Sequence, residues 1–221
     1  IGYQDTGNAA GKGKALYFKG EQWHSYSNGN GEIRVLFPRN LAFSNALRIL
    51  ALLYNEFYQH EDNSFILHAA GLRKHKKGFI FIGESGAGKT IVSKLSLPDA
   101  EVLSDESVIL SKDGEGYWIS QCPIKTEMTK LNDKRVRLYA IFSLIKDDVN
   151  AVRRLSRSEI VQKIMDNLFY VNLAERRPLV DELEKRLTFI QDVYNQVAVY
   201  ELRFKNDNSF WQEIERVGLH R

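Results

Sequence analysis

The residues that decide the fold are 78–90, GFIFIGESGAGKT. The first five form a short, continuously hydrophobic run, which is typical of a strand that is covered on both faces. The last eight fit the pattern G-x-x-x-x-G-K-[ST] at every position. Residues 90–97 predict a short helix that ends before Pro98. The pattern therefore lies between a strand and a helix, which is the context that a phosphate-binding loop requires.

This loop has the chemistry of a polyphosphate site. Its glycines permit backbone conformations that a Cβ would obstruct, so main-chain N–H groups can point inward around an anion. The next helix adds its positive N-terminal end. Lys89 supplies a charge for the β- and γ-phosphates, and the Thr90 hydroxyl suits a place on Mg²⁺. A chance match is expected in roughly one chain of this size in a hundred. The residues expected to bind ATP are Gly83, Glu84, Ser85, Gly86, Ala87, Gly88, Lys89 and Thr90.

Composition excludes several classes of protein. With 43% hydrophobic and 27% charged residues, the 221-residue chain is neither disordered nor collagen-like. The net charge of +3 comes from interspersed residues and does not indicate nucleic-acid binding. No apolar run reaches the roughly 18 residues of a membrane helix, and no secretory signal is present. The single Cys122 excludes an intrachain disulfide and fits a reducing compartment, so we expect a cytoplasmic protein. The chain begins with Ile1 rather than Met, so we expect further residues upstream.

The rest of the chain predicts a layered domain of mixed strands and helices. Residues 1–62 form a strand-rich lead and a helix: a flexible segment over 1–14, strands within 15–38 with a turn at Asn28–Gly31, and a helix over 41–58. Residues 63–221 form the second part, which packs with the first as one compact unit. Its expected strands are 64–72, 78–82, 100–104, 107–110, 117–120, 137–145 and 196–204. Its expected helices are 90–97, 159–171, 178–194 and 209–217.

Three polar segments have both a structural and a functional interpretation. Asp105 and Glu106 follow a strand downstream of the loop and are either turn residues or the acids that a phosphoryl-transfer site needs for Mg²⁺ and for the hydroxyl proton. Their position after the loop favours the second interpretation. His68 lies among apolar residues, either as a core histidine or beside a phosphate. The basic residues 73–78 favour a solvated hairpin turn over a docking patch for an acidic partner.

The segments LHAAG (67–71), GFIFIGESGAGKT and LSDESVIL (103–110) together resemble the catalytic domain of HPr kinase/phosphorylase and its shorter relatives, which include kinases of lasso-peptide clusters. The resemblance covers roughly residues 60–205. It implies an α/β (mixed α+β) fold like the nucleotide core of phosphoenolpyruvate carboxykinase, with a bent mixed sheet flanked by helices. It also implies that His68 lies beside the phosphates and that Asp105 is the general base. Glu106 matches the second acid, where the bifunctional enzymes carry Asp, and Glu127 matches a metal ligand.

The chain departs from the bifunctional enzymes in two respects. The long N-terminal domain is replaced by a short lead, and the glycine-rich signature after the second acidic site is missing. Neither phosphorolysis nor HPr as the acceptor is therefore expected. Because the bifunctional relatives form hexamers, the resemblance raises a homo-oligomer as an expectation.

The leading hypothesis is an ATP- and Mg²⁺-dependent kinase that phosphorylates a serine or another hydroxyl on a protein, peptide or small molecule. Its catalytic residues are Asp105, His68, Glu106 and Lys89, and its metal ligands are Thr90, Asp105 and Glu127. Arg153, Arg154 or Arg157 could add positive charge, although a solvated cluster at a helix start is favoured. The alternatives are a non-catalytic ATP sensor and an NTPase. Neither nucleic acid nor a membrane is an expected partner.

Overall fold

The computed structural model describes residues 3–8, 11–18, 21–27, 33–36, 64–122, 135–167 and 179–217. The first four ranges form an antiparallel sheet in the order β1-β2-β3-β4. Its strands are β1 (Tyr3–Asn8), β2 (Gly11–Phe18), β3 (Glu21–Ser27) and β4 (Ile33–Leu36). The expectation of a flexible segment over 1–14 was wrong, because a backbone ladder can form between polar, glycine-rich strands without an apolar pattern. The turn predicted at Asn28–Gly31 and the helix predicted over 41–58 lie outside the described residues.

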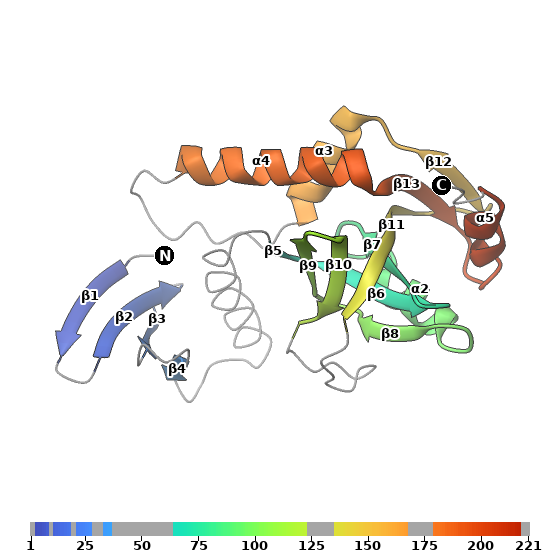
Figure 1. Ribbon diagram of the computed structural model, residues 1–221. Coiled ribbons are helices and arrows are strands. Elements are labelled where there is room, and N and C mark those ends of the chain that lie inside the picture. The colour runs from blue at the N-terminus through green and yellow to red at the C-terminus, as the bar shows by residue number, and fades with distance from the viewer. Residues whose placement is uncertain are drawn as a thin grey trace.

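The described part of 64–217 is a mixed α/β structure, in which a curled nine-strand mixed sheet forms a half-barrel with four helices (Figure 1). The strands are β5 (Ser64–Leu67), β6 (Ala69–Lys74), β7 (Lys77–Ile82), β8 (Glu101–Ser104), β9 (Val108–Asp113), β10 (Gly116–Gln121), β11 (Arg135–Lys146), β12 (Ala151–Arg154) and β13 (Ala198–Phe204). The helices are α2 (Lys89–Ser96), α3 (Arg157–Asn167), α4 (Leu179–Gln196) and α5 (Phe210–Arg216). The predicted mixture of strands and helices and the bent mixed sheet are thereby confirmed.

The order of the sheet is β5-β9-β10-β11-β7-β6-β8, with β13 added to β11 and β12 added to β13. β11 runs parallel to β7 and to β13, whereas the other neighbouring pairs are antiparallel. The predicted strand over 64–72 is divided at His68 into β5 and β6. β12 was not predicted, because its four residues include two arginines and none of the four is buried.

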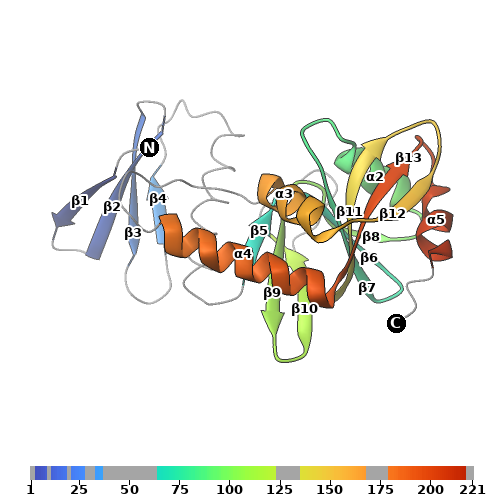
Figure 2. The same cartoon turned by 90° about the horizontal axis from the view of Figure 1, so that it is seen from above.

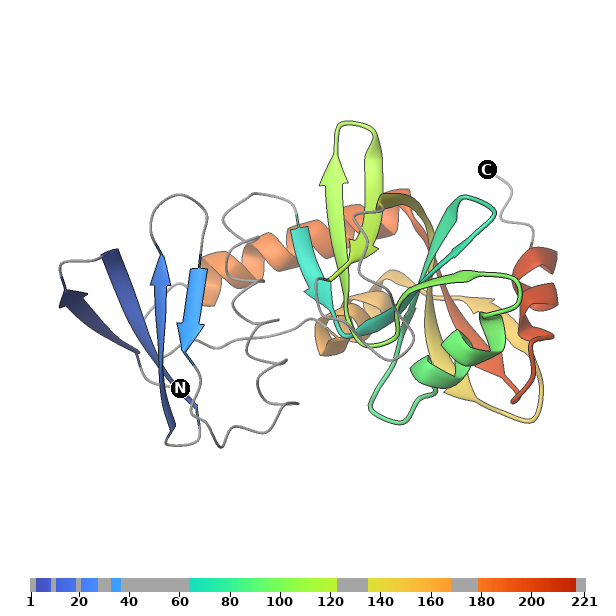
Figure 3. The same cartoon turned by 90° about the horizontal axis from the view of Figure 1, so that it is seen from below.

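The side chains of β7 explain why helices cover both faces of the sheet. Phe79 and Phe81 belong to one buried cluster, with Val92 of α2 and Trp211 of α5 among its members. Ile80 and Ile82, which alternate with them, belong to a second cluster that includes residues of α3 and α4. The prediction that this hydrophobic strand is covered on both faces is therefore confirmed. Figures 1 and 2 show α3 and α4 on one side of the sheet, and Figure 3 shows α2 beside β6 and β8.

Two glycines allow different strands of the curled sheet to approach each other closely. A Cβ on Gly71 of β6 would overlap the Cγ1 atom of Val108 at the start of β9. A Cβ on Gly78 of β7 would lie 2.9 Å from the carbonyl oxygen of Arg137. The β6–β7 hairpin can thus lie directly against β9, β10 and the start of β11. Its turn at His75 and Lys76 has positive φ at both residues, so the predicted turn is confirmed.

No helix among the described residues is long and apolar enough to cross a membrane.

We predict that Gly71→Ala lowers the free energy of unfolding by about 1–3 kcal/mol, because the added methyl group overpacks the core against Val108. Gly114→Ala is the matched control, since a Cβ there meets nothing within 4 Å and the residue lies in the exposed β9–β10 turn. We expect the control to change stability by less than about 0.5 kcal/mol. Urea unfolding measures both variants, and equal effects would contradict the close approach of β6 to β9.

Candidate functional site

The register of the sheet brings the predicted site residues together at one end of its strands, which we call the site edge of the sheet. Ala69 at the start of β6 pairs with Ile82 at the end of β7, and Gly71 pairs with Ser104 at the end of β8. Leu67 at the end of β5 pairs with Val108. The phosphate-loop motif, His68 and the Asp105–Glu106 pair therefore leave the sheet at the site edge. Ligands of α/β sheets bind at the carboxyl ends of strands, which is where β5, β7 and β8 end here.

The loop after β7 has the backbone that its sequence predicts. Gly86 has φ +85° and Gly88, the residue before α2, has φ +108°. Both values lie in the region that favours glycine. The Ala87 N–H donates to the Glu84 carbonyl at 3.0 Å, which closes the turn. Glu84, Ser85 and Gly86 are exposed, so the outer side of the loop is open to a ligand.

Lys89 begins α2 and lies under the loop. Its side chain is buried, and its Nζ atom donates to the carbonyl oxygens of Gly83 at 2.6 Å and Glu84 at 3.2 Å. Burial lowers the pKa of the Lys89 ammonium from its ordinary value, and the negative charge of Glu106 opposes that shift. An anion on the loop would add to the effect of Glu106 and favour the charged form. Thr90, the next residue, is exposed in the first turn of the helix.

Asn167, the last residue of α3, fixes two parts of the site at once and was missed by the sequence analysis. Its Oδ1 atom accepts from the N–H of Gly83 at 3.1 Å, and its main-chain carbonyl accepts from the N–H of His68 at 2.7 Å. Its own Nδ2 donates to the carbonyl of Lys163 at 2.8 Å. A signal was present, because Asn167 follows Ile160 and Ile164 along the buried stripe of α3. A buried polar residue there needs a partner.

His68 lies beside Glu106. The Nδ1 atom of His68 is 3.6 Å from Oε1 of Glu106, and the N–H of Ala69 donates to the Glu106 carbonyl at 3.2 Å. Both side chains are partly exposed, at 31% and 56%. His68 is therefore not a core histidine, and its ring lies at the surface of the site with a carboxylate neighbour.

Asp105 carries a carboxylate oxygen that nothing in the described part of the protein satisfies. Its Oδ1 atom is buried and has no hydrogen-bond partner there. The loop that holds it is fixed by Ser104, whose Oγ accepts from the N–H groups of Glu106 at 3.2 Å and Ser107 at 3.0 Å. A buried, unsatisfied acceptor costs roughly 1–3 kcal/mol, so this oxygen is suited to a ligand that donates a proton or to a cation. Ser104, itself buried, is a second residue that the sequence analysis missed.

The expected metal ligands are only partly described. Glu127 lies outside the described residues. Within the described ranges, no group of three or more His, Cys, Asp or Glu side chains could hold a metal ion. Mg²⁺ at phosphoryl-transfer sites is usually held by one or two carboxylates together with phosphates and water. The Asp105 carboxylate and the exposed Thr90 hydroxyl fit that pattern of ligation.

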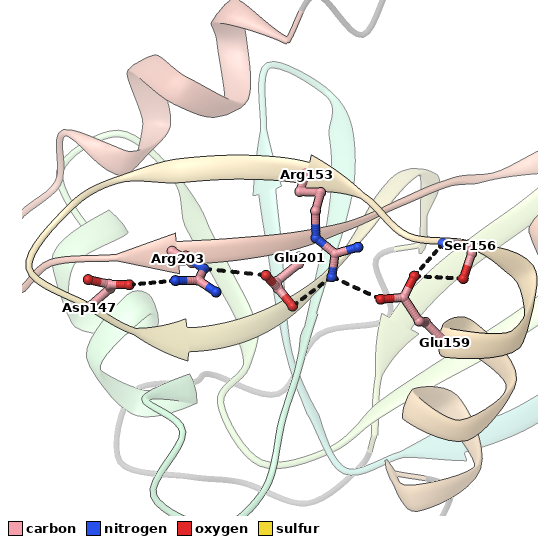
Figure 4. Close-up of polar contacts among 6 residues, drawn as sticks. All are labelled: Asp147, Arg153, Ser156, Glu159, Glu201 and Arg203. Carbon is pink, nitrogen blue, oxygen red and sulfur yellow. Dashed lines mark hydrogen bonds and ion pairs between the residues drawn. The ribbon is translucent and has the colours of Figure 1, made fainter.

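Arg153 takes part in an ionic network rather than standing free at the site. Its guanidinium donates to Glu159 at 2.9 Å and to Glu201 at 3.0 Å, and Arg203 continues the network from Glu201 to Asp147 (Figure 4). The hydrogen bond from Arg153, followed by those from Ser156, holds the pKa of Glu159 at about 2.

The same network begins α3. Ser156 donates to the Glu159 carboxylate from its N–H at 2.8 Å and from its hydroxyl at 2.6 Å. This contact resembles half of a capping box, in which the acid of the first turn reaches back to the residue before the helix. The network thereby joins β12 and β13 to the start of α3, while Asn167 joins the end of that helix to the phosphate loop.

The comparison with protein families identifies the family of the chain. The model of the family described as SynChlorMet cassette protein ScmC matches residues 32–219, which is most of the chain and includes the whole of the site described above. No curated protein matches the chain.

We predict that Asn167→Ala weakens binding of Mg-ATP by about tenfold, because the N–H of Gly83 loses its acceptor and the loop loses one geometric restraint. Asn150→Ala is the matched control: Asn150 also joins distant segments through its side chain, to Ser209 and to the N–H of Lys205, but lies in none of the site's contacts. Isothermal titration measures both. Equal affinities for the two variants would show that Asn167 supports the fold without shaping the loop.

Proposed function

The chain belongs to the ScmC family, and we propose that it is an ATP- and Mg²⁺-dependent kinase that transfers the γ-phosphoryl group to a serine or another hydroxyl. The observation that carries the proposal is the buried, unsatisfied Oδ1 of Asp105, a residue at the site edge, where the phosphate-loop motif also lies. A phosphate-binding loop alone is shared by kinases, hydrolases and sensors. A carboxylate with an oxygen in need of a proton donor is what a kinase adds to such a loop.

We also propose that the fold is that of the HPr kinase-like domains and of the phosphoenolpyruvate carboxykinase nucleotide core. Three features support this assignment: the curled mixed sheet, the β6–β7 hairpin that leads into the loop, and the pair of acids after β8. In the doubly wound sheets of many phosphate-loop proteins, the strand before the loop has parallel neighbours. Here β7 has antiparallel β6 on one side and parallel β11 on the other.

The residues of the loop would bind the phosphates in the following way. The N–H groups of 83–89 and the N-terminal end of α2 would face the phosphate oxygens. Lys89 would exchange its bonds to the carbonyls of Gly83 and Glu84 for bonds to phosphate oxygen. This exchange replaces hydrogen bonds within the loop by bonds to the ligand. The ammonium then lies beside the negative charge that develops on the phosphate oxygens during transfer. Thr90, Asp105 and Glu127 would hold Mg²⁺, which neutralises phosphate charge when bound.

Asp105 would act as the general base. The acceptor hydroxyl would donate its hydrogen bond to Oδ1 of Asp105, and its proton would pass to that carboxylate as the oxygen bonds to the γ-phosphorus. The bond between the γ-phosphorus and the β–γ bridging oxygen breaks at the same time, and ADP leaves with that oxygen. His68, which lies beside Glu106, would contact a phosphate oxygen.

We expect Mg-ATP to raise the unfolding temperature of the wild-type chain by several degrees. A ligand at 100 times its dissociation constant adds about 2.7 kcal/mol of stability, which corresponds to such a shift for a chain of this size. Lys89→Met should lose the shift, since it removes the buried ammonium while keeping a long unbranched side chain. Differential scanning fluorimetry checks both. No shift in the wild type would contradict nucleotide binding itself.

Asp105→Asn should keep the affinity for Mg-ATP within a few-fold, because the amide oxygen of Asn can still ligate Mg²⁺. It should lower phosphoryl transfer by about 10²-fold or more, because an amide cannot accept the hydroxyl proton. Asp99→Asn is the control, since it removes the same charge from an exposed turn between α2 and β8. Transfer is measured with γ-labelled ATP and a panel of serine-containing peptides and small alcohols. Binding without transfer to any acceptor would favour the ATP sensor, and free phosphate released equally with and without acceptor would favour the NTPase.

A further inference from the structure

A second lysine reaches the phosphate loop from a strand that the sequence motif does not include. Lys146 is the last residue of β11, which runs parallel to β7 with Ser143 in register with Ile82. Both strands therefore end at the site edge of the sheet. Phe142, Leu144 and Lys146 alternate along β11 and share one face, because side chains two residues apart on a strand point the same way. Phe142 and Leu144 pack in the cluster that contains Val92 of α2.

The contacts of Lys146 and of Phe204, its neighbour on β13, show that the Lys146 side chain points toward Gly88. Lys146 is in register with Phe204 of β13. The ring of Phe204 and the Cε atom of Lys146 both approach Gly88, the residue before α2, and Cε lies 3.3 Å from the point that a Cβ of Gly88 would occupy. The aliphatic part of Lys146 thus lies against the end of the phosphate loop, on the side toward the start of α2.

The ammonium group of Lys146 is uncommitted within the described part of the chain. The residue is exposed, and its Nζ atom has no hydrogen bond or ion pair there. Its acidic neighbour Asp147 is occupied by the guanidinium of Arg203 and by the N–H of Asp148. By contrast, three other cations near this end of the sheet are paired: Arg153 and Arg203 in the network of Figure 4, and Lys205 with Asp207.

We propose that Lys146 is a second phosphate-binding cation, which contacts the β- or γ-phosphate of ATP from the Gly88 side of the loop. This inference rests on the proposed nucleotide site. The charge at that site supports it, since the buried cation Lys89 is accompanied by the carboxylates of Asp105 and Glu106. Mg-ATP still carries net negative charge, and at a site with two carboxylates it requires more positive charge than Lys89 and the helix N-terminus supply. Lys146 provides it from a rigid strand end.

The test compares Lys146→Met, Lys146→Arg and Lys94→Met in the whole chain, with Mg-ATP titrated calorimetrically. Lys146→Met keeps an unbranched stem against Gly88 and removes only the charge. We expect it to weaken Mg-ATP binding about tenfold at low salt, with a smaller loss at high salt because the contact is exposed. Lys146→Arg should stay within about threefold of the wild type. Lys94, an exposed residue farther along α2, is the control for the loss of one charge and should bind as the wild type does.

Each other outcome overturns the assignment in a distinguishable way. Wild-type affinity in Lys146→Met would remove Lys146 from the site and leave the nucleotide proposal intact. An equal loss in Lys146→Met and Lys94→Met would assign the effect to net charge rather than to contact. An equal loss in Lys146→Met and Lys146→Arg would assign it to packing on Gly88. Failure of the wild type to bind Mg-ATP would overturn the proposed function, and the role of Lys146 with it.

Discussion

Twelve residues of one strand, β11, carry the hydrogen-bond ladders of three neighbours. β10 pairs with its start in antiparallel fashion, whereas β7 and β13 pair with it in parallel from Leu138 and Ala140 onward. A register shift within the parallel β7–β11 ladder lies between Leu138 and Ala140, where the pairing of β11 with β10 has ended and its pairing with β13 begins. Since one strand must satisfy all three partners, the sheet cannot remain flat, and its β9–β10 portion turns over the β6–β7 hairpin. Gly71 and Gly78 remove the side chains that would prevent this approach.

The same pairing explains where the site forms. Because β11 is parallel to β7, the two strands end together, and β8 ends beside them through antiparallel β6. Elements that are distant in sequence therefore place a loop of N–H groups, a buried lysine, a histidine and two acids at the site edge. The central strands β7 and β11 contribute apolar residues to both buried clusters. The polar groups of the candidate site lie beyond the ends of β5, β7 and β8, outside these two clusters.

Local patterns predicted the elements well and their long-range consequences poorly. The continuous hydrophobic run Phe79–Ile82 predicted a doubly covered strand, because adjacent side chains on a strand must face opposite sides. The octet 83–90 predicted glycine conformations that a Cβ would obstruct, and Gly86 and Gly88 have positive φ. Residues 1–14 were assigned wrongly, since main-chain ladders leave little trace in polar, glycine-rich sequence. Asn167 was missed because its importance depends on a hydrogen bond to Gly83, 84 positions earlier in the chain.

α3 shows how such a distant residue can control the loop. The helix is 11 residues long, or about 16 Å at 1.5 Å per residue, and both of its ends are fixed by hydrogen bonds. At its start, Glu159 is bonded to Ser156 and to Arg153, which in turn reaches Glu201 of β13. At its end, Asn167 holds Gly83 and His68. Between those ends, Ile160 and Ile164 are buried in the hydrophobic core, which fixes the face that the helix turns toward the sheet. The position of Gly83, the first glycine of the loop, thus depends on β12 and β13, to which α3 connects it, as well as on its neighbours in sequence. This connection fixes the geometry of the loop in advance, which is what its proposed role of presenting N–H groups to an anion requires.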